Sequence, residues 1–193
     1  MHTSAEPIDL VLITAPASEP ITLQDAKDQA RVCDDSDDDL ITSYITAARE
    51  YVETVTGRKL ITQTWEQRLE CFPHYPPAIA FHLYPVRSIV SVTYIDGDDA
   101  EQTVADEDYV LRVGRLPQII EPAYNSEWPS FSREVKIQVT VGDATAPEAA
   151  VHAIRLLVAH WYEHREAVVV GQTPTSVPLA VKTLLQSIRA RGL

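Results

Sequence analysis

The sequence has few glycines and cysteines, the residues on which many phosphate-binding, metal and thiol sites depend. It contains only 6 glycines, and none of them forms a glycine-rich phosphate-binding loop. Its two cysteines, Cys33 and Cys71, are too few for a disulfide framework or a cysteine-based zinc site, so we expect reduced thiols in the core. The pattern G-x-S-x-G is absent, and neither cysteine lies in a sequence typical of an activated nucleophile. The sequence therefore offers little support for an enzyme.

Long apolar runs and a basic N-terminal region are missing as well. The apolar stretch Leu10 to Ile13 is too short for a signal peptide or a membrane span, so we expect a protein made in the cytoplasm, without a membrane partner. With 45% apolar residues and no biased tract, the composition is typical of an ordered globular chain. Its 193 residues suit one folding unit, with or without an insertion.

Basic residues are scarce relative to acidic ones, and the net charge is −12. The 12 acids and 4 bases of residues 1–58 give −8, the 13 and 7 of 59–146 give −6, and the 3 and 5 of 147–193 give +2. Such an acidic chain does not suit a protein that holds DNA by neutralising phosphates, so a DNA-binding accessory protein is disfavoured. The basic C-terminal segment instead favours an acidic partner surface.

The spacing of apolar residues and the capping signals predict four helices. Thr22 and Asp25 form a capping box at the start of the first helix, and Gly57 is placed to end the second. Pro147 and Pro178 suit the first position of the last two helices. The predicted helices cover about 22–31, 38–56, 147–166 and 178–190.

Between the second and third helices the apolar period changes from 3.6 to 2, which predicts strands. The sequence Asp96-Gly97 predicts a hairpin turn. On the strand before this turn, we expect Val90, Val92 and Tyr94 to share one face. The predicted strands lie within about 60–71, 79–83, 88–95, 109–113, 118–121 and 134–142.

The predicted fold class is α+β, a helical bundle of about four helices with an inserted antiparallel β unit. We expect Tyr51, Trp65 and Trp161 to anchor the core. The expected division of the chain is an extended N-terminal arm at 1–20, a helical domain from 21–58 and 147–193, and an inserted β subdomain at 59–146.

The stretch His160 to His164 reads HWYEH, which has the H-x-x-E-H form of one class of zinc peptidases. On a helix the two histidines lie one turn apart and can bind one metal ion, with Glu163 as a base toward a metal-bound water. Zinc also needs a third protein ligand, and the only acid after His164 is Glu166, two positions away. A packed structural helix is therefore the favoured interpretation, and a zinc-dependent hydrolase is the alternative.

Two further stretches allow more than one interpretation. The run DDSDDD at 34–39 has the alternating acids of a calcium loop but lacks the central glycine and distal glutamate, so we favour an acidic start of the following helix. The stretch AVVVGQTPTSVP at 167–178 fits either a buried turn between helices or a segment that docks onto a partner. From residue 167 onward the chain has three bases and no acid.

The sequence contains, in this order, the blocks ITLQDAKDQARV, DDLITSYITAAREYVETVTGRKLITQTWE, YPVRSIVSVTYIDGD, YNSEWPS and LLVAHWYEHREAVVVG. Together these blocks resemble the head–tail connector (adaptor) proteins of long-tailed phages and gene transfer agents. The resemblance spans roughly residues 20–190 and implies a non-enzymatic structural protein, without cofactor or metal, located in the neck of a virion. It also implies a homo-oligomeric ring, commonly a dodecamer, that binds the portal after DNA packaging.

The partners that the resemblance implies are the portal protein, a stopper (head-closure) or tail-terminator protein, and other copies of the chain. DNA is expected to pass through the ring without sequence-specific binding, and acids that line the channel would repel its phosphates. In this family the C-terminal segment typically reaches the portal. The candidate portal contacts are Val168, Val169, Val170, Gly171, Arg189 and Arg191.

Overall fold

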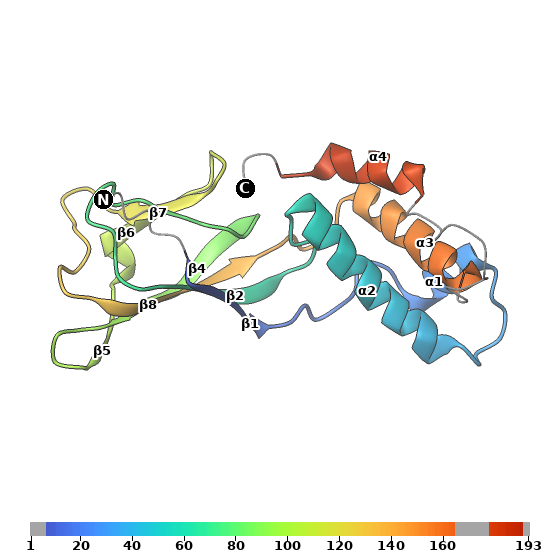
Figure 1. Ribbon diagram of the computed structural model, residues 1–193, viewed down its shortest axis with the longest axis horizontal. Helices are drawn as coiled ribbons and strands as arrows, with labels where there is room; N and C mark the ends of the chain where they lie inside the picture. The colour runs from blue at the N-terminus through green and yellow to red at the C-terminus, as the bar shows by residue number, and fades with distance from the viewer. Residues whose placement is uncertain (1–6, 165–177, 191–193) are drawn as a thin grey trace, which may run out of the picture. The chain divides into compact units, whose positions relative to one another are not determined.

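The computed structural model describes residues 7–164 and 178–190 (Figure 1). These residues form two compact units, and the predicted α+β class is confirmed. The helical unit comprises residues 18–61, 144–164 and 178–190, and the β unit comprises 7–17 and 62–143. The helices are α1 (Leu23–Ala30), α2 (Asp38–Thr56), α3 (Glu148–Glu163) and α4 (Leu179–Ile188). The strands are β1 (Asp9–Thr14), β2 (Gln63–Leu69), β3 (Ile79–Ala80), β4 (Val86–Ile95), β5 (Glu101–Thr103), β6 (Tyr109–Arg112), β7 (Ile119–Pro122) and β8 (Arg133–Val141), with a 3-10 turn η1 (Asp106–Asp108).

The helix ends follow the signals in the sequence. The capping box is confirmed, because Thr22 Oγ1 accepts from the Asp25 amide at 3.1 Å and Asp25 Oδ2 accepts from the Thr22 amide at 3.1 Å. Gly57 ends α2 with a φ of 64°, a conformation that costs glycine little. Pro147 and Pro178 each lie one position before α3 and α4, with an extended ψ, rather than inside the first turn.

In the helical unit, α3 packs against the three other helices (Figure 1). Helices α2, α3 and α4 bury residues three or four positions apart, because that spacing puts them on one face. The buried apolar residues that these helices share are Ala26, Ile41, Ile45, Ala48, Val52, Ala150, Ala153, Ile154, Leu157, Val158, Val181 and Leu185.

The β unit contains a five-stranded antiparallel sheet, in the order β1-β2-β8-β4-β5, and a three-stranded sheet in the order β3-β7-β6. Strand β8 alternates regularly, and its buried face places Val135, Ile137, Val139 and Val141 in the core. Strand β1 lies within the segment expected to be an arm and forms one edge of the larger sheet (Figure 1).

The expected common face holds for Val92 and Tyr94, which pack in the same core, but is wrong for Val90. The register of β4 against β8 shifts between Ile89 and Ser91, so Val90 is the extra residue of a bulge. Val90 is consequently 53% exposed, whereas Val92 is fully buried. One inserted residue reverses the alternation, and the sequence alone does not show where that happens.

The expectation that the two cysteines lie in the core is also wrong. Both are free thiols with exposed side chains. Cys33 follows the left-handed residue Arg31 that ends α1, and Cys71 lies two positions beyond the end of β2. The helical pattern ends with α1, before Cys33, and the alternating pattern ends with β2, before Cys71, so neither pattern buries these residues.

Candidate functional site

The zinc-like pattern lies at the C-terminal end of α3. The ring centroids of His160 and His164 are 4.6 Å apart, and His164 Nδ1 lies 2.9 Å from the backbone oxygen of His160. Burial lowers the pKa of His160, and the neighbouring His164 lowers it further. The two imidazoles are therefore close, and the neutral form of His160 is favoured.

A zinc site would need a third ligand beside these rings. Within residues 7–164 and 178–190, no group of three His, Cys, Asp or Glu side chains could hold a metal ion. The zinc-hydrolase alternative thus has no complete ligand set in this part of the chain.

The residues between the two histidines connect α3 to α2 and to the segment that precedes α2. The ring of Trp161 makes edge contacts with Tyr44 and Tyr51, at centroid distances of 6.1 and 6.5 Å. The hydroxyl of Tyr162 donates to Asp37 Oδ2 at 2.7 Å. Trp161 and Tyr51 are both partly buried against the helical core, while Trp65 packs against the core of the β unit.

The acidic run 34–39 leads directly into α2, so the prediction of an acidic helix start is confirmed. Two of its carboxylates bind the buried side chain of Lys27, whose Nζ lies 2.6 Å from Asp35 and 2.7 Å from Asp38. The hydrogen bonds to these carboxylates raise the pKa of Lys27. The run is therefore engaged in contacts within the helical unit, which leaves the calcium interpretation without support.

A buried ionic cluster of the helical unit was missed by the sequence analysis. Arg49 Nε lies 2.8 Å from Glu19, and its Nη1 lies 3.6 Å from Glu53, a carboxylate that is only 3% exposed. Glu53 also accepts from the backbone of Leu60 at 2.9 Å and pairs with Lys59 at 3.3 Å. This cluster joins the C-terminal half of α2 to Glu19 before α1 and to Lys59 and Leu60 after α2. No local motif indicates the contact with Glu19, because Arg49 lies 30 positions away from it.

The candidate portal contacts are described only in part. Arg189 is exposed immediately after α4, and the next residue, Ala190, donates to Thr56 O at 2.9 Å. Val181 and Leu185 hold α4 against the helical core. Val168 to Gly171 and Arg191 lie outside the described residues.

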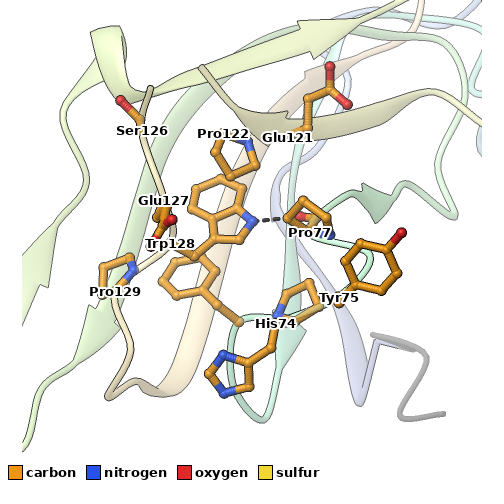
Figure 2. Close-up of a pocket in the computed structure, with 11 residues that line it drawn as sticks. His74, Tyr75, Pro77, Glu121, Pro122, Ser126, Glu127, Trp128 and Pro129 are labelled. Atoms are coloured by element: carbon orange, nitrogen blue, oxygen red, sulfur yellow. Dashed lines mark hydrogen bonds between the residues drawn. The ribbon is translucent and has the colours of Figure 1, made fainter. Parts of the chain in front are cut away.

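The β unit contains a pocket of about 460 Å³ that the sequence analysis did not anticipate (Figure 2). The rings of Phe72 and Trp128 stack at 4.6 Å, and the indole of Trp128 donates to Pro77 O at 2.6 Å. Figure 2 shows this indole at the centre, with Tyr75 on one side and Pro129 on the other. The lining residues are Phe72, Pro73, His74, Tyr75, Pro77, Glu121, Pro122, Ser126, Glu127, Trp128 and Pro129.

The only signal of this pocket in the sequence is the clustering of prolines and aromatic residues in FPHYPP (72–77) and EWP (127–129). The second stretch belongs to the block YNSEWPS, which was interpreted as a family resemblance and not as a site. Pairing of strands distant in sequence brings the two stretches together, so their proximity does not follow from local patterns.

A family of known proteins matches part of this chain. The family model described as phage gp6-like head-tail connector protein matches residues 20–108. This protein resembles the phage head–tail connectors. The resemblance inferred from the sequence blocks is thereby confirmed, and the matched segment contains α1, α2 and the strands from β2 to β5.

Solved structures share the fold of nearly the whole connector-like chain. A chain of the neck of an empty GTA particle, computed with C6 symmetry, has a TM-score of 0.74 and 22% identity. A chain of the virion of a native gene transfer agent (GTA) particle has a TM-score of 0.76 and 22% identity. A third, from the neck of a native GTA particle computed with C12 symmetry, has a TM-score of 0.74 and 23% identity. Each match covers 96% of this chain and 98% of the other.

A comparison with curated proteins gave no significant match. In the described parts of the chain, every helix is too short or too polar to cross a membrane.

Proposed function

We propose that this protein is a structural head–tail connector, a subunit of the ring in the neck of a phage-like particle. The match of residues 20–108 to the connector family is the observation that carries this proposal. The shared fold with chains of GTA necks, computed with C6 and C12 symmetry, supports a ring with six or twelve equivalent positions. These comparisons favour a structural protein over an enzyme.

The connector ring binds the portal on one side and a stopper or tail-terminator protein on the other. The C-terminal segment is the proposed portal contact, in agreement with the resemblance. Its described part, 178–190, has two bases, Lys182 and Arg189, and no acid, in a chain whose net charge is −12. Both bases are exposed, so they are available to an acidic partner surface.

Ring closure requires head-to-tail contacts, and each subunit must present two different complementary faces. An excess of acids on the channel surface would let DNA pass without adhering, because carboxylates repel phosphates. In the β unit, carboxylates are concentrated at the turn after β4, at Asp96, Asp98 and Asp99, and in η1. Reversing the charge of channel-facing acids should slow DNA ejection, and an unchanged ejection rate would count against this role.

The experiment that tests the connector function is electron microscopy of particles made without this protein. We expect DNA-filled or leaking heads that lack tails. Complementation with the wild type and with the His160→Ala/His164→Ala variant should both restore tailed particles, because the function does not use a metal. Normal tailed particles in the absence of the protein would overturn the proposal. Failure of the histidine variant alone, together with stoichiometric zinc in the wild type, would revive the hydrolase alternative.

A further inference from the structure

We propose that the pocket around Trp128 is a docking site for a segment of another protein that carries a lysine or arginine beside a proline or other apolar residue. The site belongs to the β unit and is distinct from the C-terminal segment proposed to contact the portal. The proposal does not depend on the connector function, since it is argued from the lining of the pocket and from the charged and aromatic residues of the β unit.

Part of the pocket wall is apolar, and its two stacked aromatic rings are held in place before any partner arrives. The stacked rings of Phe72 and Trp128 lie nearly parallel, with an angle of 4° between them. The polar group of the indole is already satisfied by Pro77 O, at 2.6 Å. Trp128 is only 9% exposed, so the ring is fixed and its surroundings present proline and aromatic surface. Grooves of this kind are typical binding sites for extended, proline-containing segments.

The charge of the pocket determines which segments fit. Glu121 and Glu127 line it, and the lining contains no lysine or arginine. Arg112 pairs with Glu121 at 2.8 Å, whereas Glu127 is exposed and no partner for it is found in the described residues. Ser126 of the lining donates to Asp108 Oδ1 at 2.9 Å, which brings the acidic turn η1 to the same edge. A cation on the incoming segment complements this charge.

An exposed aromatic ring completes the site. Tyr75 lines the pocket and is 88% exposed, and Figure 2 shows its ring projecting beside Pro77. An exposed tyrosine face can bind a guanidinium or ammonium group, and tyrosine is among the residues that dominate binding at protein interfaces. Tyr124 and Phe131, which flank the second lining stretch in sequence, are 94% and 81% exposed. An exposed tyrosine in the pocket lining, with two exposed aromatic residues close in sequence to a lining stretch, is typical of an interface.

The charge and the lining of the pocket also indicate which class of molecule binds there. DNA is excluded by its phosphates, which the pocket carboxylates repel. A second copy of this chain has a net charge of −12, but from residue 167 onward it has three bases, two prolines and no acid, so self-docking is the competing occupant that the sedimentation test below detects. A different protein with a basic, proline-compatible segment is the occupant that the charge and the lining fit.

The test is selection from a random 12-residue peptide library on the intact protein, followed by NMR titration of the chosen peptides. We expect enriched peptides to contain Arg or Lys next to Pro or an apolar residue, and to shift the indole N–H signal of Trp128. Glu127→Lys and Tyr75→Ala should each weaken binding about tenfold. Asp98→Lys is the matched control, because it makes the same charge change on an exposed residue of the β unit outside the pocket.

Three results would overturn the proposal. The first is the absence of any enriched peptide. The second is enrichment of peptides that lack a cation, or that bind the wild type and the Glu127→Lys variant with equal affinity. The third is self-association of the wild type in sedimentation velocity that Glu127→Lys or Tyr75→Ala abolishes, because the occupant would then be a second copy. Tyr75 and Glu127 are exposed, and circular dichroism should show both variants folded as the wild type.

Discussion

The hydroxyl of Tyr162 lies 2.7 Å from Asp37 Oδ2, and this hydrogen bond joins the two stretches of the sequence that most resemble metal sites. Tyr162 belongs to the zinc-like pattern on α3, and Asp37 belongs to the acidic run before α2. Each stretch thus supplies a contact that packs the helical unit. Both stretches therefore contribute to the folding of the helical unit.

Replacement of Tyr162 with Phe should destabilise the protein by about 1 kcal/mol, because the Asp37 carboxylate loses a hydrogen-bond donor while the ring is kept. Urea unfolding measures the change. Tyr44→Phe is the control, since the ring of Tyr44 contacts Trp161 and no hydrogen bond of its hydroxyl is found in the described residues. Equal stability of the two variants would show that the contact with Asp37 contributes nothing.

Trp161→Ala should cost about 3 kcal/mol of unfolding free energy, because the indole packs between the rings of Tyr44 and Tyr51. His160→Ala should cost less than about 1 kcal/mol, since it removes a partly buried side chain from the rim of the same helix. Thermal and urea unfolding of the two variants gives the comparison. Stabilisation of the wild type by added zinc, lost in His160→Ala, would contradict the structural interpretation of the motif.

The stability contribution of His160 should depend on pH. Burial lowers its pKa below the ordinary value of about 6.5, so the folded state binds fewer protons than the unfolded state as the pH falls. The contribution is therefore present above about pH 6.5 and is lost as the pH falls through the folded pKa. NMR titration of the imidazole should show the lowered midpoint, and His164→Gln should raise it by removing a neighbouring charge. A midpoint at or above the ordinary value would refute this account.

The β4 bulge predicts unequal effects for two valines two positions apart. Val92→Ala should destabilise the β unit by about 2 kcal/mol, because its side chain is fully buried. Val90→Ala should cost less than about 0.5 kcal/mol, because Val90 is exposed at the bulge. Denaturant unfolding of the two variants tests this difference. Similar losses would mean that β4 keeps a regular alternation.

Negative charge introduced into the C-terminal segment should block portal attachment without unfolding the monomer. Arg189→Asp replaces an exposed cation after α4, and Val169→Asp puts a charge into the valine run. Co-sedimentation with purified portal measures attachment, and circular dichroism verifies folding. Asp98→Asn, on an exposed residue of the β unit, serves as the control. Attachment at the wild-type level by both Asp variants would remove this segment from the portal interface.

Several helices and strands of this protein follow from local physical chemistry that the sequence alone shows. A capping box, a C-terminal glycine and apolar residues at helical or alternating spacing act within a few positions of each other, so α1, α2 and β8 formed where the patterns predicted. The order of several sequence blocks also carried the resemblance to the connectors, which no single motif could establish.

Tertiary structure alone decided the contacts between residues far apart in the chain. The burial of Lys27 between two aspartates, the bulge that exposes Val90, and the stacking of Phe72 on Trp128 each depend on which helices or strands meet. Such meetings are set by the packing of the whole core and not by any local preference. The sequence therefore determined the elements and the family resemblance, whereas only the packed fold created the acidic, aromatic pocket of the β unit.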